Sequence, residues 1–115
     1  MQVQRAVEKL IRLSPSVRVV TVCDMNGKIV FSARSRKAKM LLSKKESMIS
    51  LQLAVRAWKI RKKLERKLGA CKYVLAEYGN IKRITMPAGR NHILYVTTSG
   101  SFDHNKVIRK VRSFR

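Results

Sequence analysis

The most constraining feature of this sequence is an apolar, β-branched run from Val17 to Cys23, followed by an Asn26-Gly27 pair and a second run from Ile29 to Phe31. A strand loses its polar–apolar alternation when both faces of its sheet are covered, so the first run predicts a central strand. Asn-Gly between two apolar runs indicates a hairpin in which both turn residues have positive φ. We therefore expect a sheet with helices on both faces.

Helices are predicted at both ends of the chain and at its centre. Apolar residues at helical spacing predict a first helix within residues 2–13, and Phe102 to Phe114 place their apolar residues on one side of a last helix. Ser43 and Glu46 fit a capping box, so a long central helix is expected to begin there and to run to about residue 68, where Gly69 can end it.

Three more strands are predicted within residues 73–78, 81–86 and 93–98. The last is again continuously apolar, and its pairing with the run from Val17 would join all strands into one sheet. The predicted fold is α+β, in the order αββαβββα, with a five-stranded antiparallel sheet in a single domain covering residues 1–115. The expected continuous core contains Val19, Val20, Val22, Ile29, Phe31, Val74, Leu94 and Val96.

Several segments carry a resemblance to known proteins: Val22-Cys23-Asp24 with Gly27, Leu41-Leu42-Ser43, residues 72–78, residues 81–87, Asn91-His92-Ile93-Leu94 with residues 96–98, and Asp103-His104. The element order resembles the Roadblock/LC7 domain, which is profilin-like. The residues are more similar to a family of small uncharacterised proteins from ammonia-oxidising archaea. The resemblance spans nearly the whole chain and implies a Roadblock/LC7-like fold. It implies no activity, and the archaeal proteins are near neutral where this chain is strongly basic.

The charge is the main clue to function. With 27 Lys plus Arg against 6 Asp plus Glu, the formal net charge is +21, which favours a polyanionic partner. Between Arg56 and Lys67 there are seven bases and one acid, Glu65. Like charges on one helix face repel, and phosphates would offset that cost. The predicted nucleic-acid-binding residues are Arg34, Arg36, Lys37, Lys39, Lys44, Lys45, Arg56, Lys59, Arg61, Lys62, Lys63, Arg66, Lys67, Arg109, Lys110, Arg112 and Arg115.

This distribution predicts a structural RNA-binding component of a ribosome or other ribonucleoprotein, which reads phosphate backbone and shape. RNA, most of all rRNA, is favoured over DNA because bases occur on several elements, whereas linear DNA needs one basic face. Neighbouring proteins in such a particle would be further partners. One alternative is a DNA-binding, chromatin-type protein.

The other alternative is a Roadblock-like interaction module for an acidic partner. The resemblance implies that such domains commonly dimerise through the central helix and an adjacent sheet edge. The candidate surface for a homodimer is Met48, Leu51, Val55 and Trp58, unless the chain's own loop around residues 40–42 covers it.

Catalysis and metal binding have little support in the sequence. The six acids are scattered and no catalytic motif is present, so we expect no enzyme and no cofactor. Cys23 and Cys71 lie far apart in strand-like runs, which predicts reduced, buried thiols without metal. No apolar run is long enough for a membrane span or a signal peptide, which predicts a cytoplasmic protein. A membrane-surface role is disfavoured because the basic helix is expected to lack an exposed bulky apolar face beside its charges.

Overall fold

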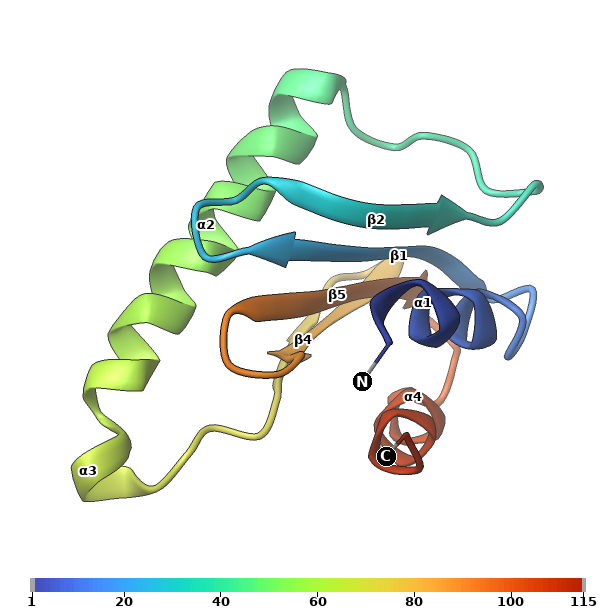
Figure 1. Cartoon of the computed structure of the whole chain (residues 1–115). Coiled ribbons are helices and arrows are strands. Elements are labelled where there is room, and N and C mark those ends of the chain that lie inside the picture. The colour runs from blue at the N-terminus through green and yellow to red at the C-terminus, as the bar shows by residue number, and fades with distance from the viewer. Residues whose placement is uncertain (1, 115) are drawn as a thin grey trace.

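The computed structural model describes residues 2–114, and its elements follow the predicted order. They are α1 (Val3–Ile11), β1 (Val17–Asp24), β2 (Ile29–Arg34), α2 (Lys44–Lys63), α3 (Glu65–Leu68), β3 (Val74–Glu77), β4 (Ile81–Pro87), β5 (His92–Ser99) and α4 (His104–Arg112). The strands form one antiparallel sheet in the order β2-β1-β5-β4-β3. Helix α2 lies on one side of this sheet, and α1 and α4 lie on the other (Figure 1). The predicted fold class and the central pairing of β1 with β5 are confirmed.

The β1–β2 hairpin forms as predicted, but its turn has a different geometry. Among residues 2–114 only glycines have positive φ, so Gly27 (φ 84°) is left-handed and Asn26 is not. The Asp24 carboxylate accepts backbone hydrogen bonds from Lys28 (2.9 Å) and Asn26 (2.8 Å), and these bonds lower the pKa of Asp24. This Asx-type turn replaces the expected pair of left-handed residues.

Helix α2 begins where the capping box predicts. Ser43 Oγ accepts from the Glu46 N–H (3.1 Å), and Glu46 Oε1 accepts from the Ser43 N–H (2.9 Å). The predicted continuous helix to residue 68 is interrupted at Leu64, and the last turn forms the separate helix α3. Gly69 (φ 82°) then ends it, as expected.

The larger core lies between the sheet and the pair α1 and α4. Val20, Val22, Leu94 and Val96 are fully buried there, as predicted, and Phe31 packs against them. The other members of this core are Val7, Leu10, Val17, Ile84, Met86, Ala88, Val107, Ile108 and Val111.

Three predicted core residues are not part of this cluster. Strand alternation places Val19 and Val74 on the α2 side of the sheet, where Val74 packs partly buried and Val19 borders a hollow. Ile29 is 48% exposed because it begins the edge strand β2. The expectation of one continuous core containing all eight residues is therefore wrong.

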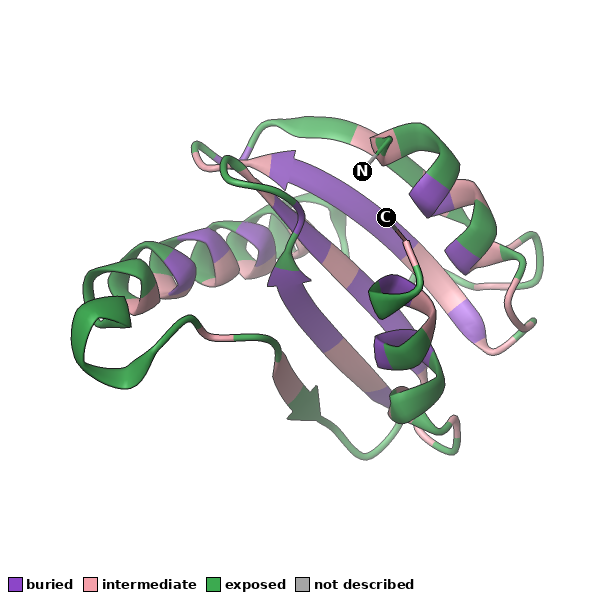
Figure 2. Cartoon of the chain, turned by 60° about the horizontal axis from the view of Figure 1, so that its bottom comes forward, coloured by how far each residue is buried: buried purple, intermediate pink, exposed green. Residues whose placement is uncertain are grey.

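A smaller cluster joins α2 to the sheet. It consists of Cys23, Leu51, Val55, Trp58 and Ile93. The Trp58 indole N–H donates to Thr85 Oγ1 at 2.8 Å, a buried bond that fixes the rotation of α2 about its axis. Figure 2 shows buried residues concentrated on the strands and on the sheet-facing sides of the helices.

Candidate interaction surface

The side chains that α2 turns toward the sheet are those predicted to form a dimer surface. Leu51, Val55 and Trp58 are buried, and only Met48, 47% exposed at the side of the helix, remains accessible. The prediction that these four residues form an interface is wrong. The chain's own sheet covers them, because the bond from Trp58 to Thr85 and the packing on Cys23 and Ile93 fill that face.

The opposite side of α2 carries an exposed apolar row. Ile49, Leu53, Ile60 and Leu64 are between 45% and 67% exposed, and we call them the outer ridge. At 100° per residue they fall on the helix side directly opposite Leu51, Val55 and Trp58. Leu68, on the separate helix α3, is 78% exposed. Helix α2 therefore presents apolar side chains both to the sheet and away from it.

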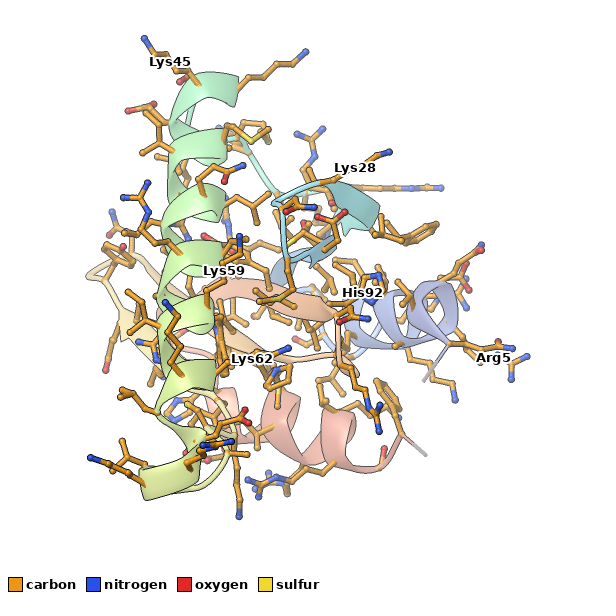
Figure 3. All side chains as sticks on the ribbon, turned by 60° about the vertical axis from the view of Figure 1, so that its left-hand side comes forward. Arg5, Lys28, Lys45, Lys59, Lys62 and His92 are labelled. Carbon is orange, nitrogen blue, oxygen red and sulfur yellow. The ribbon has the colours of Figure 1, made fainter. Side chains whose placement is uncertain are left out.

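Basic residues lie alongside the outer ridge. Arg56, Lys59, Lys63, Arg66 and Lys67, which we call the basic stripe, are all exposed; the first three fall within about 60° of arc on α2, and the last two lie on α3. Figure 3 shows side chains projecting from α2, with Lys45, Lys59 and Lys62 labelled. The expectation that no bulky apolar face lies beside these charges is wrong, because the outer ridge adjoins them. Among residues 2–114, no helix has both the length and the apolar character to cross a bilayer.

The remaining predicted basic residues do not belong to this surface. Arg36, Lys37 and Lys39 lie exposed between β2 and α2, while Arg34 ends β2 and Lys44 and Lys45 begin α2. On α2 itself, the Arg61 guanidinium lies 5.5 Å from the Trp58 ring centroid, and Lys62 donates to the Arg90 carbonyl. Arg109, Lys110 and Arg112 lie on α4, across the sheet, and Arg115 is outside the described residues.

Half of the acidic side chains accept hydrogen bonds from backbone N–H groups. The carboxylates of Asp24, Glu46 and Asp103 each accept backbone N–H bonds at a turn or at a helix start. These bonds lower the carboxyl pKa of all three residues; for Asp103 the donor is the Asn105 N–H. With only six acids against 27 bases, little negative charge remains to neutralise the basic stripe.

The two cysteines differ from each other. Cys23 is fully buried, and burial, followed by the charge of Asp24, raises its pKa to about 11. Cys71 is only partly buried, and it lies before β3 in a segment without regular structure, where its thiol contacts the Tyr73 carbonyl (3.7 Å). The prediction that both thiols are buried in strands is wrong for Cys71. Within residues 2–114, no cluster of three or more His, Cys, Asp or Glu could hold a metal ion.

Comparison with known proteins identifies the fold. No family model and no curated protein matches this chain. Among solved structures it is similar to the gliding protein MglB of Thermus thermophilus, with 15% identity, a TM-score of 0.75, and coverage of 95% of this chain and 82% of that one. A Roadblock/LC7 domain from Streptomyces avermitilis has 12% identity and a TM-score of 0.73, and the match covers 97% of this chain and 90% of that one. An MglB structure with a tetrameric arrangement has 16% identity and a TM-score of 0.76, and the match covers 95% of this chain and 81% of that one.

The chain thus has the Roadblock/LC7 fold, and this likeness overturns the main functional prediction. The likeness is to solved structures such as MglB and Roadblock/LC7 domains rather than to ribosomal components. The prediction of a structural RNA-binding component of a ribosome, with RNA as its partner, is therefore wrong. The interaction-module alternative agrees better with the fold. Composition alone misled because a large positive charge favours any polyanionic partner and does not distinguish RNA from an acidic protein.

Proposed function

We propose that this protein is a Roadblock-type interaction module that pairs with a second copy through the outer ridge of α2. The observation that carries this proposal is the exposure of Ile49, Leu53, Ile60 and Leu64 along one helix face. Single exposed apolar residues are ordinary, but a contiguous row marks an interaction surface. Because an isologous pair uses the same patch on both copies, ridge would meet ridge. The tetrameric arrangement of one MglB structure supports self-association in this fold.

The charge predicts how this pairing depends on salt. Each chain carries +21, and the basic stripe borders the outer ridge, so two copies brought ridge to ridge repel each other. Added salt screens that repulsion, while burial of the apolar ridge persists. The homodimer should therefore strengthen as the salt concentration rises.

Sedimentation equilibrium between about 0.05 and 0.5 M salt tests this proposal. We expect a dimer that tightens with salt, and a folded monomer for Leu53→Glu combined with Ile60→Glu. Leu41→Glu is the matched control, because Leu41 is 59% exposed but lies outside α2. A wild-type monomer under all conditions, or equal disruption by the control, would contradict pairing through the ridge.

The basic stripe supports a second contact, with an acidic protein partner. The five bases of the stripe lie on α2 and α3, and the chain has only six carboxylates, three of which are held in turns and caps, so this surface carries uncompensated positive charge. Polyglutamate is a suitable probe, and its binding should weaken as salt rises, opposite to the homodimer. Lys59→Gln with Lys63→Gln should weaken polyglutamate binding and strengthen the homodimer. Arg109→Gln with Arg112→Gln, on α4, removes the same charge elsewhere, and an equal loss with this pair would contradict the assignment.

We also propose that the chain is related to the small proteins of ammonia-oxidising archaea that its sequence resembles. This proposal rests on the residue segments quoted above, from Val22-Cys23-Asp24 to Asp103-His104.

A further inference from the structure

A hollow of about 420 Å³ lies beside the N-terminal half of α2, on the sheet side of the helix. Its walls come from β1, β2, β4, β5, the segment before α2 and the first two turns of α2. This volume is within the range of cavities that hold small organic ligands. The hollow is separate from the outer ridge, because α2 lies between them.

Small side chains keep this hollow open. Thr21 and Ser32 of the sheet share a hydrogen bond (2.8 Å) on its floor, and Ser47 and Ser50 of α2 face it from the helix. Leu51 borders the hollow, whereas Val55 and Trp58, the other bulky residues of α2 that reach the sheet, lie one or two turns further along the helix. The first half of α2 therefore covers the sheet without filling the space beneath it.

The lining of the hollow has apolar walls and positive charge. Val19, Leu42, Met48, Leu51 and Ile81 supply apolar surface. None of the described lining residues is Asp or Glu. The charged lining residues are all basic: Arg18, Arg34, Lys39, Lys44 and Arg83. Such a combination suits a ligand that has an apolar body and a negative head group.

Arg83 is the group that most needs a ligand. Its guanidinium lies 5.6 Å from the ring centroids of both Tyr78 and Tyr95, and Nη1 donates to Ser50 Oγ at 2.7 Å. Ser50 Oγ in turn contacts the Tyr95 hydroxyl at 2.8 Å. The Arg83 Nε is buried and has no acceptor among residues 2–114. A guanidinium is always charged, so an anion in the hollow would be attracted to Arg83 and would pair with the Nη side of the guanidinium, while the buried Nε stays covered by the protein.

We propose that this hollow binds an amphiphile with a single carboxylate head, of the fatty-acid class, with the head at Arg83 and the apolar chain against Val19, Leu51 and Met48. The rim bases Arg18, Lys39 and Lys44 add electrostatic attraction. This inference is independent of the homodimer, because it uses the sheet side of α2 rather than the outer ridge.

Calorimetric titration of the full chain with decanoate tests the proposal. We expect saturable one-to-one binding of decanoate and none of decyltrimethylammonium, which has the same chain length and the opposite charge. Decyl phosphate tests the head group, and tighter binding of the phosphate than of the carboxylate would overturn the carboxylate assignment. Binding of the cation as tight as that of decanoate would overturn the role of Arg83.

Variants test whether decanoate binds in this hollow. Arg83→Gln should weaken decanoate binding at least 10-fold, and Arg83→Lys, which keeps the charge without the fork, should weaken it less. Ser47→Leu fills the hollow and should also reduce affinity at least 10-fold, so the test stands if Arg83→Gln fails to fold. Arg109→Gln on α4 is the charge-matched control and should bind as the wild type does. Leu53→Glu on the outer ridge should leave decanoate binding unchanged. An effect of either control equal to that of Arg83→Gln, or unchanged binding by Ser47→Leu, would overturn the proposal.

Discussion

The two faces of the sheet are built from alternate residues of the same strands, yet they differ in chemistry. Toward α1 and α4 the central strands present aliphatic side chains such as Val20, Val22 and Leu94. Toward α2 the intervening positions include Thr21 and Tyr95, together with Arg83 of β4. Because strand neighbours point to opposite faces, one sequence run can serve two purposes. The aliphatic face forms the larger core, and hydroxyl groups on the other face form hydrogen bonds with α2.

The helices differ in the same way. Helix α1 buries Ala6, Val7 and Leu10 within only nine residues, whereas α2 buries three of twenty. Helix α2 is held by the smaller apolar cluster and by two polar contacts, from Trp58 to Thr85 and from Arg83 to Ser50. The long helix therefore buries a smaller share of its residues than α1 does, and its outer ridge stays exposed.

The largest expected effect comes from placing a carboxylate on each face in turn. Val20→Asp should prevent folding, because its side chain is fully buried among aliphatic groups and an unpaired carboxylate there is very costly. Thr21→Asp, one residue later, points to the hollow, where Arg18 and Arg34 can pair with it. We expect circular dichroism to show an unfolded Val20→Asp and a folded Thr21→Asp. Cooperative unfolding of Val20→Asp would break the contrast between the faces.

A smaller difference should separate two leucine truncations. Leu94→Ala removes a fully buried side chain from the aliphatic core and should lower the free energy of unfolding by about 3–5 kcal/mol. Leu51→Ala opens onto a space that is already partly empty, and we expect a loss of about 2 kcal/mol. Urea titrations of both variants measure the difference. Equal losses would show that α2 is packed as firmly as α1 and α4.

The elements of the fold that depend on local sequence were predictable. The Val17–Cys23 run, the Asn26-Gly27 turn and the Ser43–Glu46 capping box each specify structure through near neighbours, and all three occur where expected. The Asn26 conformation was not predicted, because it depends on the Asp24 side chain, which competes for the turn's N–H groups.

The local sequence pattern does not determine which side of α2 faces the sheet, so the outer ridge could not be predicted as the exposed surface. The helix has two apolar stripes, and the longer one, through Ile49 and Leu53, resembles a core face. The deciding contact joins Trp58 to Thr85, 27 residues away, and no local pattern encodes it. The Trp58 indole was the available signal, because a buried Trp needs a hydrogen-bond acceptor and hydroxyl-bearing strands provide one.

The smallest expected effect uses Cys23, which lies in the α2-side cluster. Its pKa is raised to about 11 from an ordinary value of 9.0, chiefly by burial. Above about pH 9 the unfolded chain loses this proton while the folded chain keeps it, so stability falls as pH rises toward 11. We expect Cys23 to contribute no more than about 2 kcal/mol to this decline. Cys23→Ala removes that contribution but leaves every Lys and Tyr in place, so its unfolding free energy should decrease less steeply than that of the wild type between pH 9 and 11. Parallel pH curves for the two proteins would show that water reaches the thiol, and that the α2 side is looser than its packing around Cys23 indicates.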